Sequence, residues 1–217
     1  MSDRDELRGF VVGPIETNCY AYVSEGKALV VDPGASGARI AEALSDVEVT
    51  AIVATHGHHD HVCGAAALKE ATGAEWLVSE KDAWRVTQAL KLSSRVFALP
   101  DNPEERDAPK PDRTLSEGDS IEVGSARFRV IETPGHTEGG IVLVGEGTAA
   151  GVAFMGDTLF KGSCGRTDLM GGDGPTLARS LARLAAELPG ECALYCGHGE
   201  PTTMAYELAT NPYLQTR

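Results

Sequence analysis

The residues best suited to chemistry lie together in residues 55–61, which read THGHHDH. Four of the six histidines of the chain fall here within six positions, and clustered imidazole and carboxylate groups are typical metal ligands. In an extended or looping segment, His56 and His58 project to the same side, while Asp60 and His61 face a neighbouring position. These two pairs suit two adjacent metal ions, and the spacing differs from the histidines four apart of HExxH proteases.

Three further ligand-type side chains each follow an apolar segment and come directly after a glycine. They are His136, Asp157 and His198. Alone, each histidine would more often be a structural residue than a ligand. Because active-site loops gather outside the ends of strands in open α/β sheets, we predict that all three join the histidine cluster at one metal centre.

Two groups of strands, each followed by helices, must position these side chains. Short apolar runs predict strands at 10–12, 19–23, 28–31, 49–54, 120–123, 127–131, 141–144, 152–155 and 193–196. Helical spacing predicts helices at 40–44, 64–70, 81–90, 176–188 and 203–209. Residues 93–114 contain four prolines and read as a long surface excursion. The pattern indicates two sheets packed together with helices outside, and it places the histidine cluster on a strand-to-helix loop.

Composition excludes several classes of protein and partner. The chain has 217 residues, 42% hydrophobic and 24% charged, which is ordinary globular composition and excludes a disordered chain or a coiled coil. A net charge of −13 repels phosphate backbones, so we expect no nucleic-acid partner. No apolar run approaches the roughly 18 residues of a membrane span, so we expect no membrane partner. The charged N-terminus lacks a signal peptide and the five cysteines are an odd number, which predicts free thiols and a cytoplasmic setting.

The sequence resembles the metallo-β-lactamase superfamily over nearly the whole chain. The resemblance lies in the cluster at 55–61, the three later ligand candidates and the Asp32-Pro33-Gly34 turn. The resemblance implies an α/β fold, an αββα sandwich of two mixed sheets flanked by helices, with residues 1–217 as one domain. It implies two metal sites that share a bridging carboxylate: one held by His56, His58 and His136, the other by Asp60, His61 and His198, with Asp157 between them. Asp32 would support a ligand, and His59 occupies a variable position.

Three segments resemble the short glyoxalase II-like hydroxyacylglutathione hydrolases. They are residues 156–168, which read GDTLFKGSCGRTD, residues 195–198 and residues 201–214. This resemblance implies hydrolysis of a small-molecule thioester of the S-2-hydroxyacylglutathione type. A hydroxide bridging two divalent metal ions, zinc in the first place with iron or manganese as alternatives, would attack the carbonyl. Asp60 and Asp157 would orient the water or carry its proton, and Arg166 and Lys161 would contact the substrate.

The sequence departs from those hydrolases where they hold glutathione. A lysine and a tyrosine of the family are Arg166 and Asp168 here, and a second tyrosine is Glu200. Only 19 residues, 199–217, follow His198, so we expect no C-terminal helical glutathione-binding domain. Thioester hydrolysis is therefore better supported than any particular thiol carrier.

Other functions remain open at this point. Residues 164–168, CGRTD, also resemble persulfide dioxygenases of the same superfamily, which would use one iron at His56, His58 and either His136 or Asp157. A metal-binding or redox-sensing module without catalysis is the alternative from another class. The net charge disfavours a nuclease, and the absence of a signal peptide disfavours a secreted β-lactamase. Imidazole and carboxylate ligands accept zinc, iron and manganese alike. Nothing in the sequence sets an oligomeric state.

Overall fold

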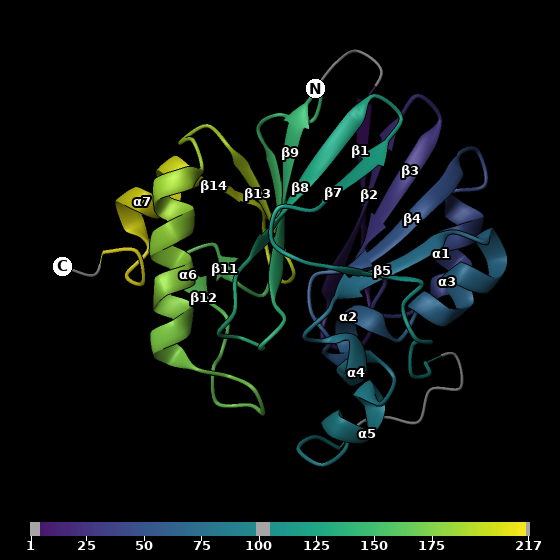
Figure 1. The fold of residues 1–217 in the computed structure, drawn as a ribbon, viewed down its shortest axis with the longest axis horizontal. Coiled ribbons are helices and arrows are strands. Elements are labelled where there is room, and N and C mark those ends of the chain that lie inside the picture. Colours follow the sequence, from purple (N-terminus) through teal and green to yellow (C-terminus); the bar gives the residue numbers. More distant parts are fainter. Residues whose placement is uncertain (1–4, 99–104, 216–217) are drawn as a thin grey trace.

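The computed structural model describes residues 5–98 and 105–215, and its two largest elements are six-stranded sheets packed face to face (Figure 1). In the first sheet, β1 to β3 pair antiparallel, while β3 to β6 run parallel. The strands lie in sequence order: β1 (Asp5–Val12), β2 (Thr17–Ser24), β3 (Lys27–Val31), β4 (Glu48–Ala54), β5 (Glu75–Ser79) and β6 (Arg113–Leu115).

The second sheet has the order β14-β13-β10-β9-β8-β7, and only its β10–β13 pair is parallel. Its strands are β7 (Ser120–Val123), β8 (Ala126–Glu132), β9 (Ile141–Gly147), β10 (Val152–Gly156), β13 (Ala193–Cys196) and β14 (Thr202–Thr203). A separate hairpin joins β11 (Leu159–Phe160) to β12 (Ser163–Cys164). Since β8, β10 and β13 all run in one direction, their carboxyl ends meet at the same edge of the sheet.

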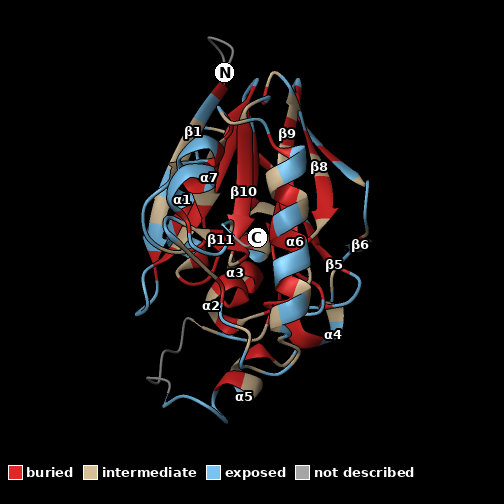
Figure 2. Ribbon diagram, turned by 90° about the vertical axis from the view of Figure 1, so that its left-hand side faces the viewer, coloured by how far each residue is buried: buried red, intermediate tan, exposed pale blue. Residues whose placement is uncertain are grey.

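Helices cover the outer face of each sheet, which confirms the predicted αββα sandwich (Figure 1). Beside the first sheet lie α1 (Gly37–Ala43) and α3 (Ala65–Thr72), with the short helices α2 (His59–Val62), α4 (Ala83–Val86) and α5 (Ala89–Ser93) near one end. Beside the second lie α6 (Gly174–Glu187) and α7 (Met204–Thr210). On α6, Leu177, Leu181 and Leu184 are buried at helical spacing, while its opposite side is exposed (Figure 2). No described helix combines the length and apolar character needed to cross a membrane.

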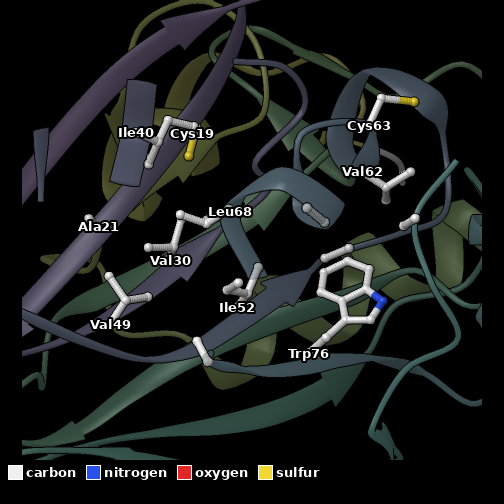
Figure 3. Packing of buried hydrophobic residues seen from close by; sticks show 14 of the residues in the cluster. Cys19, Ala21, Val30, Ile40, Val49, Ile52, Val62, Cys63, Leu68 and Trp76 are labelled. Atoms are coloured by element: carbon white, nitrogen blue, oxygen red, sulfur yellow. The ribbon is translucent and has the colours of Figure 1, made fainter. Parts of the chain in front are cut away.

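The core has an inner layer between the sheets and an outer layer under each set of helices. On β4, Ala51 and Val53 face the second sheet, whereas Ile52 and Ala54 pack in the outer layer. Figure 3 shows Ile52 in this outer layer with Leu68 of α3 and Trp76 of β5. A strand buried on both faces has a nearly continuous apolar run, and residues 49–54 depart from one only at Thr50. The histidine cluster therefore directly follows a strand that is packed on both faces.

Several elements differ from the prediction: β1 begins at Asp5 and not at residue 10, and β5 is a strand that the sequence did not predict. The helix predicted over 81–90 is wrong as one element, because the backbone leaves helical geometry at Gln88 (φ −150°) and divides it into α4 and α5. The Val86 carbonyl accepts from Ala108 N at 3.1 Å, and Asp107 Oδ1 accepts from Leu90 N at 2.8 Å. The described parts of the 93–114 excursion are therefore anchored to both short helices, and the excursion ends in β6, a strand the sequence did not predict. Residues 99–104 lie outside the described residues.

Candidate metal centre

Three imidazoles converge at the carboxyl ends of β4 and β8. His56 Nε2 lies 3.1 Å from His58 Nδ1, which in turn lies 2.9 Å from His136 Nε2. His56 and His58 follow β4 of the first sheet, while His136 follows β8 of the second. Each of the three rings offers one nitrogen, and the three nitrogens lie within 4.8 Å of one another, close enough to bind one metal ion.

A second group lies beside the first. Asp60 Oδ2 is 3.3 Å from His61 Nε2 and 3.3 Å from His198 Nε2. Asp60 and His61 belong to the single turn of α2, and His198 follows β13. The structure thus places His56 and His58 with His136, and Asp60 and His61 with His198, while His56, His61 and Asp157 form a third close group.

Asp157, at the end of β10, lies between the two groups. Its Oδ1 is 3.3 Å from His61 Nε2, and its Oδ2 is 3.5 Å from His136 Nε2 and 3.7 Å from His198 Nε2. One carboxylate therefore reaches both groups, as a bridging ligand must. The structure brings together all seven side chains that the sequence analysis selected.

The outer nitrogens of the histidines have partners that orient the rings. His136 Nδ1 lies 2.7 Å from the Arg166 carbonyl oxygen, and because a carbonyl only accepts, Nδ1 carries a proton and Nε2 is the ring nitrogen that faces His58. His61 Nδ1 lies 2.9 Å from Asp32 Oδ2, which is the supporting contact expected of Asp32. Asp32 is itself held by Thr55, which donates from its backbone nitrogen and its hydroxyl at 2.7 Å each.

Burial and neighbouring charges shift the pKa values of the cluster. Burial, together with the adjacent imidazoles, lowers the pKa of His58 to about 3 and holds the pKa of His56 well below its usual value. Burial alone would raise the pKa of Asp60, but His61 and His198 bring it well below the ordinary value. Burial alone would lower the pKa of His61, yet Asp157, Asp60 and Asp32 raise it well above 6.5. Three carboxylates around one buried ring create a strong local demand for positive charge.

Two buried atoms at the centre of the cluster test whether metal ions fit. His61 Nε2 and Asp157 Oδ1 are inaccessible to solvent and have no hydrogen-bond partner in the described structure. A buried polar atom left in this state costs about 1–3 kcal/mol. A divalent cation would coordinate both atoms and neutralise the surrounding carboxylates. The donor set therefore fits divalent metal ions.

The glycines before Asp157 and His198 allow the loops to approach one another. A Cβ on Gly197 would overlap Asp157 Oδ1 and come within 2.7 Å of His61 Cε1. Gly156 has φ +48°, and a Cβ there would lie 2.6 Å from Thr55 Cβ. A side chain at position 197 would displace Asp157 and His61, and one at position 156 would displace Thr55, the residue that holds Asp32. These contacts give the glycine-before-ligand pattern a physical basis.

Sequence reasoning missed the residues that hold the ligand loops together. The buried carboxylate of Asp82 accepts from Gly57 N at 2.8 Å and from Gly139 N at 3.1 Å, which joins the His56–His58 loop to the His136 loop. Thr17 Oγ1 donates to Asp60 Oδ2 at 3.2 Å, and Asn18 N donates to Gly197 O at 2.7 Å. No local pattern marks these residues, because each acts on a loop distant in sequence.

A cavity of about 900 Å³ opens above the cluster, with His58, Asp60, His136, Asp157 and His198 at its base. Its walls are mainly apolar and include Ile15, Phe97, Phe160 and Leu169. Of the two predicted substrate contacts, Arg166 lines this cavity and Lys161 is not among its lining residues. His59, predicted not to be a ligand, also lines it.

Comparison with known proteins now places the chain. Residues 12–198 match the family model of the metallo-β-lactamase superfamily. The chain belongs to that superfamily, whose members are mostly hydrolytic enzymes that bind divalent metals. It is 34% identical to the hydroxyacylglutathione hydrolase GloC of Haemophilus influenzae over 211 residues, 95% of this chain and 96% of the relative.

Solved structures show the same architecture. The BLEG-1 B3 metallo-β-lactamase is 30% identical with a TM-score of 0.87, and the alignment covers 97% of this chain and all of that one. TTHA1623 in a di-iron-bound form is 32% identical with a TM-score of 0.81, and the alignment covers 95% of this chain and all of that one. These relatives carry different names, and one of them was solved with two iron ions, so the comparison shows the superfamily and does not show the substrate or the metal of this chain.

Proposed function

We propose that this chain is a metal-dependent hydrolase that cleaves thioesters of the S-2-hydroxyacylglutathione type. One observation carries the proposal: two groups of ligand-type side chains, joined by Asp157, form the base of an open cavity. The GDTLF segment and the similarity to GloC support the thioester as substrate. The activity would be that of a glyoxalase II-like enzyme.

His56, His58 and His136 would hold one metal ion, Asp60, His61 and His198 a second, and Asp157 would contact both. When bound, two divalent ions lower the pKa of water and polarise a carbonyl oxygen. Zinc is the first expectation and iron or manganese the alternatives, since the donor atoms accept all three.

The protein's own groups would prepare the reaction around these ions. The Arg166 carbonyl and Asp32 fix the rings of His136 and His61, so their Nε2 atoms point inward without reorganisation. Asp60 and Asp157 would orient the attacking water by accepting its hydrogen bonds. The apolar walls would exclude bulk water from the carbonyl. A thiol leaving group has a pKa of roughly 8.5, so it departs as thiolate without a strong general acid.

Two measurements on the purified protein test the proposal: elemental analysis, and loss of thioester absorbance with S-D-lactoylglutathione. We expect metal in the protein and cleavage that His198→Ala lowers by at least about a hundredfold, since the second metal site loses a ligand. Bound metal without any thioester cleavage would instead favour a metal-binding module, and full activity of His198→Ala would contradict a catalyst with two metal ions. Arg39→Gln, an exposed change on α1, is the matched control.

The CGRTD segment at 164–168 favours one competing function, a mononuclear-iron persulfide dioxygenase. His56, His58 and His136 form a complete three-residue group in the structure, which would suffice for one iron. An oxygen electrode with glutathione persulfide separates the two activities. Oxygen uptake without any thioester cleavage would contradict the hydrolase.

A further inference from the structure

The walls of the cavity above the metal cluster leave large apolar side chains open to solvent. Ile15, Val96 and Phe97 line the cavity and are 52%, 60% and 39% exposed. Ile15 lies in the loop between β1 and β2, whereas Val96 and Phe97 follow α5. Exposed apolar side chains that converge on one cavity from distant segments mark a binding surface for an apolar group.

The apolar wall begins directly beside the ligand candidates. Phe160 of β11 lines the cavity, and the centre of its ring lies 6.1 Å from that of His198, with the two ring planes at 74°. Leu169, from the loop after β12, lines the same cavity. A substrate carbonyl held over the cluster therefore has an aromatic ring nearby, and an apolar group attached to that carbonyl can pack against it.

The side chain of Arg166 supports this wall. Its guanidinium lies over the Phe97 ring, 5.9 Å from the ring centre, and so links the loop after β12 to the segment after α5. The same guanidinium makes a two-point ion pair with Asp168, with Nε–Oδ1 at 2.6 Å and Nη2–Oδ2 at 2.7 Å. Because this pair has no net charge, Arg166 offers the cavity an apolar support and no open anion site.

The lining suits one half of the proposed substrate better than the other. Among the described residues that line the cavity, Arg166 is the one arginine and there is no lysine. Lys161 lies outside the lining, with its Nζ 2.6 Å from Glu200 Oε2. Glutathione carries carboxylates and an ammonium group, which keep their hydration best in contact with solvent. The acyl half is therefore the part that can pack against the apolar wall.

We propose that this cavity selects thioesters whose acyl group is apolar and larger than lactoyl, with Phe97 and Phe160 as the specificity-determining contacts. The inference rests on the proposed function and adds to it the nature of the acyl half. The acyl group covers the exposed apolar side chains, and the charged thiol carrier remains at the open side of the cavity. Selection then depends on the apolar area that the acyl group buries.

Two thioethers test the inference independently of catalysis, because neither can be hydrolysed. S-methylglutathione and S-hexylglutathione, whose alkyl groups take the place of the acyl group, are each titrated calorimetrically into the metal-loaded protein. One fully buried methylene group raises affinity about fourfold. Since the wall remains partly exposed, we expect half of that free energy, which is about twofold per methylene and about thirtyfold between the two probes. Equal affinities, or no binding of either probe, would overturn the inference.

Variants of Phe97 locate the contact. Phe97→Ala should reduce the gain from methyl to hexyl to below about tenfold, because the alkyl chain loses the ring as a contact. Phe97→Leu keeps an apolar side chain and should keep most of the gain. Leu208→Ala, which removes a comparably exposed apolar side chain from α7, is the matched control and should leave the gain unchanged. If Phe97→Ala and Leu208→Ala behave alike, the inference fails.

Hydrolysis of two matched substrates separates this inference from the proposed function. S-D-lactoylglutathione and S-(D-2-hydroxyhexanoyl)glutathione differ only in the length of the acyl chain, and kcat/KM should be about eightfold higher for the longer one. Cleavage of both with the same kcat/KM would overturn the inference and leave the proposed function. Cleavage of neither, with the difference in thioether affinity intact, would overturn the proposed function and leave the apolar binding site.

Discussion

Replacing Asp82 with asparagine tests whether one buried carboxylate holds the two ligand loops together. Asp82 is fully buried, lies 3.5 Å from Arg85 Nε, and accepts from Gly57 N and Gly139 N. Asparagine has nearly the same shape, but it has no charge and only one acceptor oxygen. The change therefore leaves Arg85 as an uncompensated buried charge and leaves one backbone N–H without its partner.

The size of the effect follows from these two losses. Breaking a buried ion pair from one side costs about 3–5 kcal/mol. An unpartnered buried N–H costs about 1–3 kcal/mol. Because both losses occur at one site and relax together, they do not add, and we expect the free energy of unfolding to fall by about 3–5 kcal/mol.

Urea unfolding at pH 7, followed by circular dichroism, measures this loss. Asp173→Asn is the matched control: Asp173 caps α6 by accepting from Thr176 N, and asparagine caps a helix about as well as aspartate. The metal content of Asp82→Asn should also fall, because Gly57 lies between His56 and His58. A stability loss below about 1 kcal/mol, within the range of an ordinary substitution, would refute the reasoning.

Three further perturbations have defined outcomes. Gly197→Ala should lower metal content and cut hydrolysis at least about tenfold, because its Cβ overlaps Asp157; elemental analysis and the thioester assay measure both. Glu207→Ala should lower the free energy of unfolding by about 3 kcal/mol, because this buried carboxylate accepts from Thr202 Oγ1, Gly162 N and Asn211 Nδ2. Urea titration measures this loss, and an unchanged unfolding midpoint would contradict the prediction. Removing metal with a chelator should lower the melting temperature, and adding zinc should restore it. Scanning calorimetry measures both. Identical transitions with and without chelator would mean that metal does not contribute to the stability of the fold.

The sequence allowed prediction of features encoded locally. The apolar run at 49–54 predicted a strand that is buried on both faces. The histidines and the carboxylate of residues 55–61 predicted a metal centre directly after this strand. His136, Asp157 and His198 could be joined to that cluster because each ends an apolar strand. The fold class followed from the same pattern of strands and helices.

The rest depends on contacts between distant segments. Asp82 lay inside a predicted helix and carried no sign of its bonds to Gly57 and Gly139. Strand β6 has three residues and pairs with β5, a contact that only the folded chain reveals. The apolar residues 76–78 marked β5 locally, but the sequence analysis did not predict it. Arg166 was selected by its position in a motif, but its pairing with Asp168 emerges only when both side chains are placed in space.

The two sheets are contiguous halves of the chain, since β1 to β6 end at Leu115 and β7 to β14 begin at Ser120. The first half contributes the four ligand candidates of residues 55–61, and the second contributes His136, Asp157 and His198. Neither half alone contains both groups, so two separately expressed fragments would each carry an incomplete centre. A mixture of the two fragments would contain the full ligand set at one place only when the two sheets pack together. Binding of metal by the mixture would then measure this association.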